Sequence, residues 1–382
     1  MHYVLSVRIA VARETLPGEA RVALVPELVP ALVKAGYEVA VQPGAGLGAL
    51  FTDDAYIAAG ALSDDDLSAA GLVISVQPLP LDVLRSLRPE LATLSFFPAP
   101  QRLPEVVARR DGGLTTFAME FVPRISRAQS MDALTSQSLV AGYRAAVVAA
   151  GRLRQFFPLS MTAAGTVPPA QVVVLGAGVA GLQAIATAKR LGAVVKGYDV
   201  RPSSAEEIRS MGALAIELDL PALEGTGGYA REMTEERAER QRELLTPYVA
   251  AADALITTAA VPGRRAPLLV TAAMVEQMKP GSVVVDLAAD SGGNVEGVVP
   301  GQVVAVGAAQ LWGGSNVPSQ MPQPASRLYA HNVVNVVKLM TADGALAPDF
   351  DDEIVAAMCV THRGQVRHER TAKELQGDVS SD

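Results

Sequence analysis

The chain has 382 residues, enough for two or three domains, and 49% of them are hydrophobic, so a large core can form. Acidic residues exceed basic ones by 40 to 32, which gives a net charge of −8 and argues against nucleic-acid binding. The single cysteine, Cys359, excludes an internal disulfide, and the four histidines are too scattered for a metal site. We therefore expect neither a nucleic-acid partner nor a bound metal.

No targeting or membrane segment is evident. The apolar stretch near the N-terminus is broken by Arg8 and lacks the basic-then-apolar order of a signal peptide, so Val7–Ala12 is predicted to be a strand. The longest apolar run, Ser138–Gly151, contains Arg144 and is too short to span a bilayer. We expect a cytoplasmic protein with no direct membrane insertion.

Strand and helix patterns alternate through the first third of the chain. Pro26–Gly36 is predicted to be a helix because Pro stands near its start and Gly at its end. Short apolar runs predict buried strands at Tyr37–Val41, Leu72–Val76, Leu91–Phe96 and Leu114–Phe117. This alternation is typical of a parallel sheet with helices on both faces.

Longer helical patterns divide the rest of the chain. A helix predicted at about 126–157 ends before Pro158 and is interpreted as a connection between two domains. A second α/β region covers about 171–306, and a helix at about 321–340 is expected to return the chain to the first domain. The polar tail after Lys373 is predicted to be disordered.

A glycine-rich motif follows the strand predicted at Val172–Leu175. Residues 176–181 read Gly-Ala-Gly-Val-Ala-Gly and match G-x-G-x-x-G. A helix, Leu182–Leu191, and a strand, Ala193–Tyr198, come next, and Asp199 ends that strand. Because these parts stand in this order, they predict the fingerprint of a dinucleotide-binding Rossmann domain rather than an ordinary glycine-rich turn.

Each position of the fingerprint has a physical task. Gly176 permits the tight turn, Gly178 lets a pyrophosphate approach the backbone, and Gly181 lets helix and strand pack closely. The helix N-terminus, near Val179, offers N–H groups and a positive dipole end to the phosphates. A second glycine cluster at 44–48 lacks the third glycine and the acid, so we interpret it as a loop.

The residues after the second strand indicate which nucleotide is bound. Asp199 can accept hydrogen bonds from the adenosine ribose and would repel a 2′-phosphate, which favours NAD over NADP. Arg201 lies close by and weakens this preference. The predicted fold class is therefore α/β: two Rossmann-like, doubly wound parallel-sheet domains joined by long helices, with a cleft between them. The expected boundaries are 1–140, completed by about 322–382, for the first domain, and 141–321 for the NAD(H)-binding domain.

A segment dense in polar groups, 123–138, precedes the apolar part of the long helix. It resembles the signature loop of the NAD(H)-binding component of proton-translocating NAD(P) transhydrogenases. In that family an Arg, a Gln and an Asp of this loop hold the nicotinamide end of the cofactor, and these roles map to Arg124, Gln129 and Asp132. Thr135 stands where the family often has Ser, so a hydroxyl is retained.

The resemblance extends over most of the chain. Residues 19–26 resemble the opening motif shared by transhydrogenases and alanine dehydrogenases, and 199–201 resemble the family's contact with the adenosine ribose. Residues 227–230 resemble a mobile loop whose Tyr folds over the nucleotide, and 257–263 and 285–288 resemble strand ends that line the same cleft. The resemblance and the fingerprint together predict contacts with NAD(H) at Arg124, Gln129, Asp132, Thr135, Gly176, Gly178, Val179, Gly181, Asp199, Val200, Arg201, Gly228, Tyr229, Gln241 and Ala260.

Several of these segments also have a purely structural interpretation. Ser126 and Gln129 fit a capping box at the start of the long helix, and Arg124 and Asp132 fit a surface ion pair. Residues 225–243 fit a solvated loop and helix. Trp312, the only tryptophan, is interpreted as a packed core aromatic.

The resemblance implies direct hydride transfer, as in a Re/Si-specific NAD(P) transhydrogenase, between NAD(H) on this chain and NADP(H) on a partner subunit. It implies a homodimer docked on an NADP(H)-binding subunit and a membrane-spanning subunit, and so a cytoplasmic chain peripherally associated with the inner (plasma) membrane. In this role Gln129, Arg124 and Asp132 orient the ring for the reaction, because the protein must supply proximity and orientation.

Two other functions remain open. An alanine dehydrogenase-like amino-acid dehydrogenase would need acid–base groups, and its family uses a Lys and a His in the first domain. This chain has no lysine between Lys34 and Lys189 and no histidine between His2 and His331, and Gln77 stands where the Lys is expected. We therefore expect no general acid of suitable pKa there. A noncatalytic NAD-binding module is the other alternative.

Overall fold

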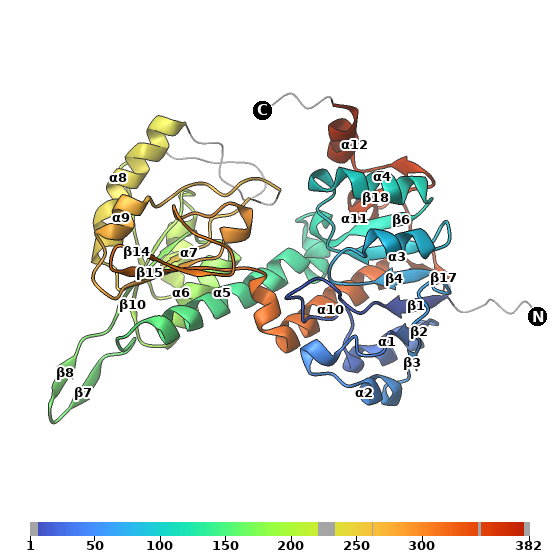
Figure 1. The fold of residues 1–382 in the computed structure, drawn as a ribbon, viewed down its shortest axis with the longest axis horizontal. Helices are drawn as coiled ribbons and strands as arrows, with labels where there is room; N and C mark the ends of the chain where they lie inside the picture. Colours follow the sequence, from blue (N-terminus) through green and yellow to red (C-terminus); the bar gives the residue numbers. More distant parts are fainter. Residues whose placement is uncertain (1–6, 221–233, 262, 343–344, 378–382) are drawn as a thin grey trace, which may run out of the picture. The chain divides into compact units, whose positions relative to one another are not determined.

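The computed structural model describes residues 7–220, 234–261, 263–342 and 345–377. It divides into two compact units (Figure 1): unit 1 comprises residues 1–137 and 319–382, and unit 2 comprises residues 138–318. Over the described residues, each unit is built on one large sheet, of eight strands in unit 1 and seven in unit 2. None of the helices in these described ranges combines the length and the apolar character needed to cross a bilayer.

The sheet of unit 1 is parallel except at one edge. Its strands are β1 (Arg8–Val11), β2 (Glu38–Val41), β3 (Leu62–Ser63), β4 (Leu72–Ile74), β5 (Ala92–Ser95), β6 (Thr115–Ala118), β18 (Cys359–His362) and β19 (Gln365–Val366). They lie in the order β19-β18-β6-β5-β4-β1-β2-β3, with β18 and β19 antiparallel to their neighbours. The chain winds outward from β1 to β3 and then the other way from β4, so a topological switch point lies between β1 and β4.

Helices cover both faces of this sheet. The helical segments of unit 1 are η1 (Pro26–Leu28), α1 (Val29–Lys34), η2 (Leu47–Ala49), α2 (Asp53–Ala58), α3 (Leu81–Ser86), η3 (Ala99–Gln101), α4 (Leu103–Asp111), η4 (Met119–Phe121), η5 (Ser126–Met131), α10 (Pro322–Leu339), α11 (Glu353–Met358) and α12 (Glu369–Gln376). A short hairpin, β16 (Thr341–Ala342) and β17 (Ala345–Leu346), follows α10. Because α12 continues to Gln376, the predicted disorder after Lys373 is wrong for that stretch.

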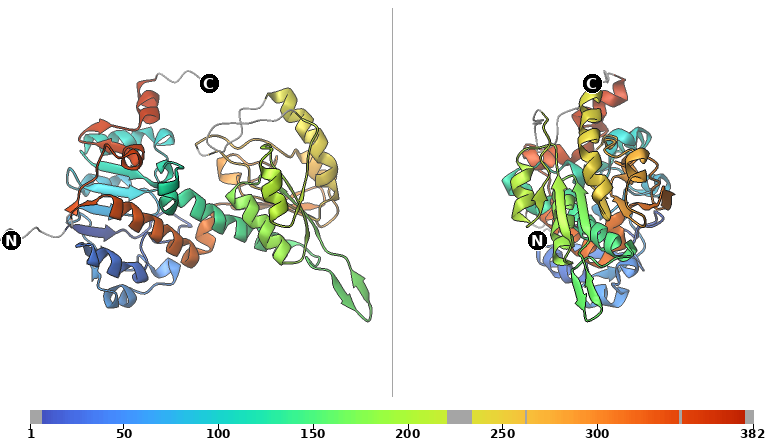
Figure 2. Two further views of the ribbon diagram at one scale, coloured as in Figure 1. Left: turned by 180° about the vertical axis from the view of Figure 1, so that it is seen from behind. Right: turned by 90° about the vertical axis from the view of Figure 1, so that its left-hand side faces the viewer.

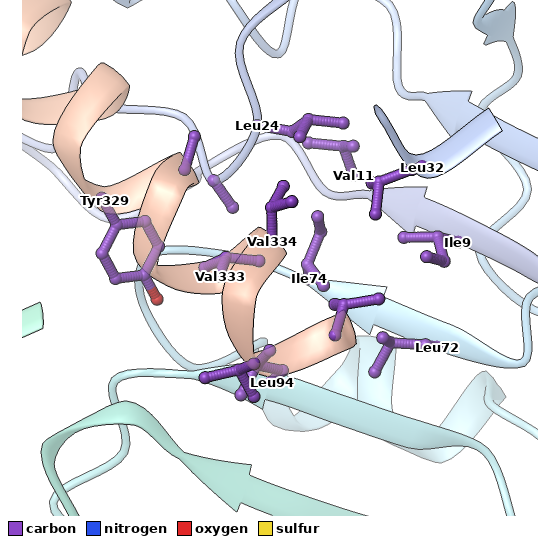
Figure 3. Close-up of a cluster of buried hydrophobic side chains, with 14 of the residues drawn as sticks. Ile9, Val11, Leu24, Leu32, Leu72, Ile74, Leu94, Tyr329, Val333 and Val334 are labelled. Carbon is purple, nitrogen blue, oxygen red and sulfur yellow. The ribbon is translucent and has the colours of Figure 1, made fainter. Parts of the chain in front are cut away.

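Strand residues that alternate in sequence form the core of unit 1. Ile9 and Val11 of β1 and Ile74 of β4 are fully buried beside α10 (Figure 3), as the two-residue period of a strand requires. Each such side chain stabilises the fold by about 1.5–3 kcal/mol through burial. Tyr329 of α10 is also fully buried, and its hydroxyl donates to the carbonyl of Ser75 at 2.9 Å, which ties α10 to the end of β4.

The sheet of unit 2 has the same kind of winding. Its strands are β9 (Gln171–Leu175), β10 (Val194–Tyr198), β11 (Leu214–Ala215), β12 (Ala254–Thr257), β13 (Val283–Asp286), β14 (Val303–Val306) and β15 (Ala309–Gly313). They lie in the order β11-β10-β9-β12-β13-β15-β14, and only β14 is antiparallel. The strand order therefore reverses between β9 and β12, next to the end of β9.

The two faces of this sheet are buried by different helices. The helical segments of unit 2 are α5 (Ala133–Arg152), which begins in unit 1, α6 (Val179–Arg190), α7 (Ser204–Ser210), α8 (Glu235–Ala251), α9 (Ala272–Glu276), η7 (Ala289–Ser291) and η8 (Val317–Gln320), which leads into unit 1. Val172 and Val174 of β9 pack with α5, α6 and α7, whereas Val173 and Leu175 pack with α8 and α9. Trp312 is buried in the first of these clusters. The predicted doubly wound α/β fold class is confirmed.

A β-hairpin, β7 (Ser160–Thr162) and β8 (Gly165–Val167), follows α5. It extends away from the sheet of unit 2 in all three views (Figures 1 and 2). Its side chains are exposed although several are apolar: Met161 is 71% exposed, and Leu159 just before the hairpin is 54% exposed.

Candidate functional site

The glycine motif forms a tight turn between β9 and α6. Gly176 has φ +98°, a conformation that L side chains rarely adopt, and a Cβ there would lie 2.6 Å from Oγ1 of Thr258. A Cβ at Gly181 would overlap the carbonyl oxygen of Gly176. The first and third glycines of the motif thus allow the turn and the close packing of α6 on β9.

The middle glycine faces open space. A Cβ at Gly178 would meet no atom of the described residues within 4 Å, so the backbone can be approached from that side. Gly178 is also the N-cap of α6, and within the described ranges this position provides no side-chain hydrogen bond to the start of the helix. The first N–H groups of a helix have no intrahelical partner, so the N-terminus of α6, which begins at Val179, can donate them to an anion. This arrangement fits a pyrophosphate.

The acid at the end of β10 reaches back to this turn. One oxygen of Asp199 accepts from the backbone N–H of Ala177 at 2.7 Å, and the other accepts from the backbone N–H and Nε of Arg201, each at 2.9 Å. The hydrogen bond and charge of Asp199 raise the pKa of Arg201 above its usual value, and Nη2 of Arg201 also donates to the carbonyl of Ala177 at 3.3 Å. Val200 between them is half-buried. Asp199 and Arg201 therefore lie beside the glycine turn.

Gln241 supplies a further polar group to unit 2. It is 1% exposed, and its Oε1 atom has no hydrogen-bond partner among the described residues, which is costly for a buried acceptor. One helical turn later, Leu245 packs in a cluster with Leu175 and Tyr198, so this side of α8 faces the ends of β9 and β10. The predicted contacts Gly228 and Tyr229 lie outside the described residues.

The end of β12 forms the other side of the switch point. Thr258 follows β12, and its hydroxyl donates to the carbonyl of Gly176 at 3.1 Å. The next residue, Ala259, is half-buried, and Ala260 is exposed. The structure thus brings the glycine motif, Asp199 and the segment that includes Ala260 to one edge of the unit 2 sheet.

The segment 124–135 of unit 1 differs from its prediction. The expected helix from Ser126 does not form as one piece: η5 is a 3₁₀ helix without a side-chain cap, and α5 begins only at Ala133. Asp132, between them, accepts from the backbone N–H of Thr135 at 2.9 Å and from its hydroxyl at 2.6 Å. The capping box of Ser126 and Gln129 is therefore wrong, because Asp132 caps the helix instead.

This segment is anchored from one side and exposed on the other. Ala128 and Met131 of η5 are buried in the core of unit 1, and Asn332 of α10 donates to the carbonyl of Ser130 at 2.9 Å. Arg127 forms an ion pair with Asp352 at 2.8 Å. The predicted contacts Arg124, Gln129 and Thr135 have exposed side chains, and Asp132 is half-buried. The anchored segment can hold these four polar side chains in place for a ligand.

A buried polar network occupies the switch point of unit 1. Arg21 binds both oxygens of Glu19, at 2.8 and 2.6 Å, and donates to Oε1 of Gln137 at 2.8 Å. Gln77 donates to Glu19 at 2.8 Å. Desolvation opposes ionisation of Glu19, but the hydrogen bonds and charge of Arg21 prevail and lower its pKa to about 2. The opening motif at 19–26 therefore fixes the loop after β1 to the end of β4.

Two carboxyl groups near this network correct an expectation from the sequence. Glu14 accepts from the backbone N–H groups of Val76 and Gln77, and desolvation raises its pKa to about 8. Glu120 accepts from the N–H of Phe97, and desolvation raises its pKa to about 7. The expectation that this region has no acid of suitable pKa was wrong, because it considered only Lys and His. The position of both residues just after β1 and β6 was the available signal.

Comparisons with known proteins show the family of the chain. The family described as alanine dehydrogenase/PNT, N-terminal domain, matches residues 10–141, and alanine dehydrogenase/PNT, C-terminal domain, matches 145–369. A curated relative, the first part of NAD(P) transhydrogenase subunit alpha from Rhodospirillum rubrum, is 45% identical over 375 residues, which are 94% of this chain and 98% of that protein.

Solved structures and more distant relatives give the same result. The crystal structure of transhydrogenase from Sinorhizobium meliloti has a TM-score of 0.84 at 41% identity and covers 95% of this chain and 99% of its own. The alanine dehydrogenase of Mycobacterium tuberculosis is 31% identical over 380 residues, with 96% of each chain covered. The chain therefore belongs to the alanine dehydrogenase/PNT family, and within it is similar to the alpha subunits of NAD(P) transhydrogenase, at higher identity than to this alanine dehydrogenase.

Proposed function

We propose that this chain binds NAD(H) as a subunit of a Re/Si-specific NAD(P) transhydrogenase and transfers a hydride directly to or from NADP(H) on a partner subunit. The proposal rests on the arrangement of groups at one edge of the unit 2 sheet. There Gly178 leaves space, α6 has no side-chain cap, and Asp199 lies against the turn. These three features support binding of a pyrophosphate next to a ribose.

The charges at this edge support NAD(H) over NADP(H). The carboxylate of Asp199 would repel a 2′-phosphate, and Arg201, the cation that would otherwise accept such a phosphate, is paired with Asp199. We expect NADH to bind the isolated chain at least about tenfold more tightly than NADPH, as a difference of roughly 1.4 kcal/mol. Titration of each nucleotide by calorimetry tests this. Equal affinities would contradict the assignment.

The proposed mechanism assigns the ring to the segment 124–135. Arg124, Gln129, Asp132 and Thr135 hold the nicotinamide end so that one face meets the second ring, and Tyr229 is assigned a contact with the nucleotide. Gly176, Gly178, Val179 and Gly181 receive the pyrophosphate, Asp199, Val200 and Arg201 receive the adenosine ribose, and Gly228, Gln241 and Ala260 complete the contacts. A hydride passes from ring to ring without a proton, so orientation rather than acid–base chemistry is what these residues supply.

We further propose that the chain is a homodimer and joins an NADP(H)-binding subunit and a membrane-spanning subunit, through which it associates with the inner membrane from the cytoplasm. The exposed apolar side chains at the β7–β8 hairpin support a protein partner there, because exposed apolar patches mark interaction surfaces. Met161→Asp should convert a dimer to monomers in sedimentation velocity. An unchanged sedimentation coefficient would contradict a dimer contact at the hairpin.

The alternative of an amino-acid dehydrogenase has one observation in its favour. Glu14 and Glu120 have pKa values near neutrality, as a general acid or base requires. Against it, Gln77, in the place expected for a lysine, is paired with Glu19. Incubation of the chain with NADH, pyruvate and ammonium should give no oxidation of NADH. Turnover would favour the dehydrogenase.

A further inference from the structure

Asn294 of unit 2 lies at the centre of a hydrogen-bonded frame that none of the predicted contacts includes. It is fully buried, and its side-chain amide makes three hydrogen bonds. Oδ1 accepts from the N–H of Ala259 at 2.9 Å, and Nδ2 donates to the carbonyls of Ala259 at 2.7 Å and Pro267 at 2.8 Å. One side chain therefore holds both ends of the segment 259–267.

The sequence before Asn294 places it there. Gly292 and Gly293 both have positive φ, +104° and +79°, which turns the chain sharply after η7. A Cβ at Gly293 would overlap Val298. Asp286, at the end of β13, then accepts from the backbone N–H of Asn294 at 2.7 Å. The backbone of Asn294 is thus held in place by Asp286 and by the turn at Gly292 and Gly293, and its side-chain amide reaches the segment 259–267 from this position.

The segment that Asn294 holds is one side of the switch point. Ala259 follows Thr258, which donates to Gly176, and a Cβ at Gly176 would lie 3.0 Å from the backbone nitrogen of Ala259. Ala260, the proposed nucleotide contact, is the next residue and is exposed. A dinucleotide lies across the crevice where the strand order reverses, with one mononucleotide half on each side. Asp199 lies on the β10 side of β9, and the segment 259–260 lies on the β12 side.

From this geometry we infer that Asn294 is a positioning residue for the nicotinamide half of the bound dinucleotide. It fixes the backbone of Ala259 against the glycine turn, and with it the position of the adjoining Ala260, so that the half of the nucleotide on the β12 side meets a fixed surface. The adenosine half does not depend on it. This inference rests on the proposed function, because it presupposes that unit 2 binds a dinucleotide.

The test compares two ligands that differ in the half on the β12 side. NADH contains both halves, whereas ADP contains only the adenosine half and the phosphates. Asn294→Ala removes three hydrogen bonds from the segment 259–267. We expect the Kd for NADH to rise on the order of tenfold and the Kd for ADP to change less than about twofold, both measured by calorimetry. Asn294→Ser, whose hydroxyl is too short to reach Ala259 or Pro267 but keeps a polar group at the site, serves if the alanine variant does not fold, and the same difference between the two ligands is expected.

A matched control separates positioning from general stability. Ser282, at the amino end of β13, is also buried, and its hydroxyl donates to the carbonyl of Lys279 at 2.6 Å, with the carbonyl of Ala252 at 3.3 Å from the same oxygen. Ser282→Ala should lower the melting temperature and leave both Kd values unchanged. Equal changes in the Kd for NADH and ADP in the Asn294 variants, or no change in either, would overturn the inference while the proposed function stands. A wild-type chain that binds neither ligand would overturn the proposed function and this inference with it.

Discussion

The two units place different chemistry at equivalent positions of the same topology. Each has a parallel sheet that reverses direction, between β9 and β12 in unit 2 and between β1 and β4 in unit 1. At the first edge, in the part of the chain that the structure describes, no atom fills the space beside Gly178, and the buried Oε1 atom of Gln241 has no hydrogen-bond partner. At the second edge, Glu19, Arg21 and Gln77 satisfy one another. The fold alone does not make a binding site, because its side chains decide whether polar groups remain for a ligand.

The largest effect should come from the glycines of unit 2. Gly181→Ala would force α6 away from the turn, because its Cβ would overlap the carbonyl of Gly176, and such overpacking costs about 1–3 kcal/mol or more. We expect loss of measurable NADH binding and a lower melting temperature. In Gly178→Ala the new Cβ meets no protein atom, so stability should stay within about 1 kcal/mol while NADH binding falls. If Gly178→Ala binds NADH like the wild type, phosphates do not lie against that turn.

The next effect concerns unit 1 and the reaction itself. Gln129 is exposed on the anchored segment η5, so Gln129→Asn should leave the fold intact and shorten the reach of the amide. We expect hydride transfer to slow on the order of a hundredfold, because a displacement of about 1 Å at a reacting group has that cost. NADH affinity, measured by calorimetry, should change far less. Equal changes in rate and affinity would contradict an orienting role.

A smaller effect tests the preference between the two nucleotides. Asp199→Asn removes the negative charge next to the ribose site and the ion pair between Asp199 and Arg201. The ratio of NADPH to NADH affinity should rise about tenfold to a hundredfold, which corresponds to the roughly 1.5–3 kcal/mol of a charged hydrogen bond. Parallel titrations measure this ratio. An unchanged ratio would mean that Asp199 does not select the nucleotide.

The smallest expected effect is on stability, and it concerns Glu14, which lies near the polar network of unit 1. The pKa of Glu14 is raised to about 8 in the folded chain. At pH values between the pKa of Glu14 in the unfolded chain and this raised pKa, the folded chain keeps a proton on Glu14 that the unfolded chain has lost. The stability that Glu14 contributes is therefore lost as the pH rises through this window. When the pH is raised from about 6 to about 9, the melting temperature of the wild type should fall further than that of Glu14→Gln. The difference between the two falls should be roughly 2–4 °C. Parallel melting curves against pH would contradict the raised pKa.

The contrast between the two units also explains which of their features could be predicted from the sequence. The fingerprint of unit 2 was predictable because its glycines, helix and acid fall within 171–201 and act through local geometry. The polar network of unit 1 was not predictable, because Arg21 donates to Gln137, which lies more than a hundred residues later in the chain. The raised pKa of Glu14 depends on desolvation by packing, which no local pattern reports.

Local patterns also misplaced one helix start and missed one residue. The pattern Ser-x-x-Gln at 126–129 fits a cap, but Ala128 and Met131 are buried in the core as part of a 3₁₀ helix, and Asp132 takes the capping position. Asn294 was missed because its partners, Ala259 and Pro267, lie 35 and 27 residues earlier in the chain. Their contact forms only when β12 and β13 pair.

The most direct test of the central claim combines this chain with the NADP(H)-binding subunit of the same organism. NADPH and a spectrally distinct NAD⁺ analogue are added, and reduction of the analogue is followed. We predict fast reduction that requires both proteins and is slowed by Gln129→Asn. Absence of reduction, with NADH still bound tightly by this chain, would contradict the transhydrogenase role and leave a noncatalytic NAD-binding module or an amino-acid dehydrogenase.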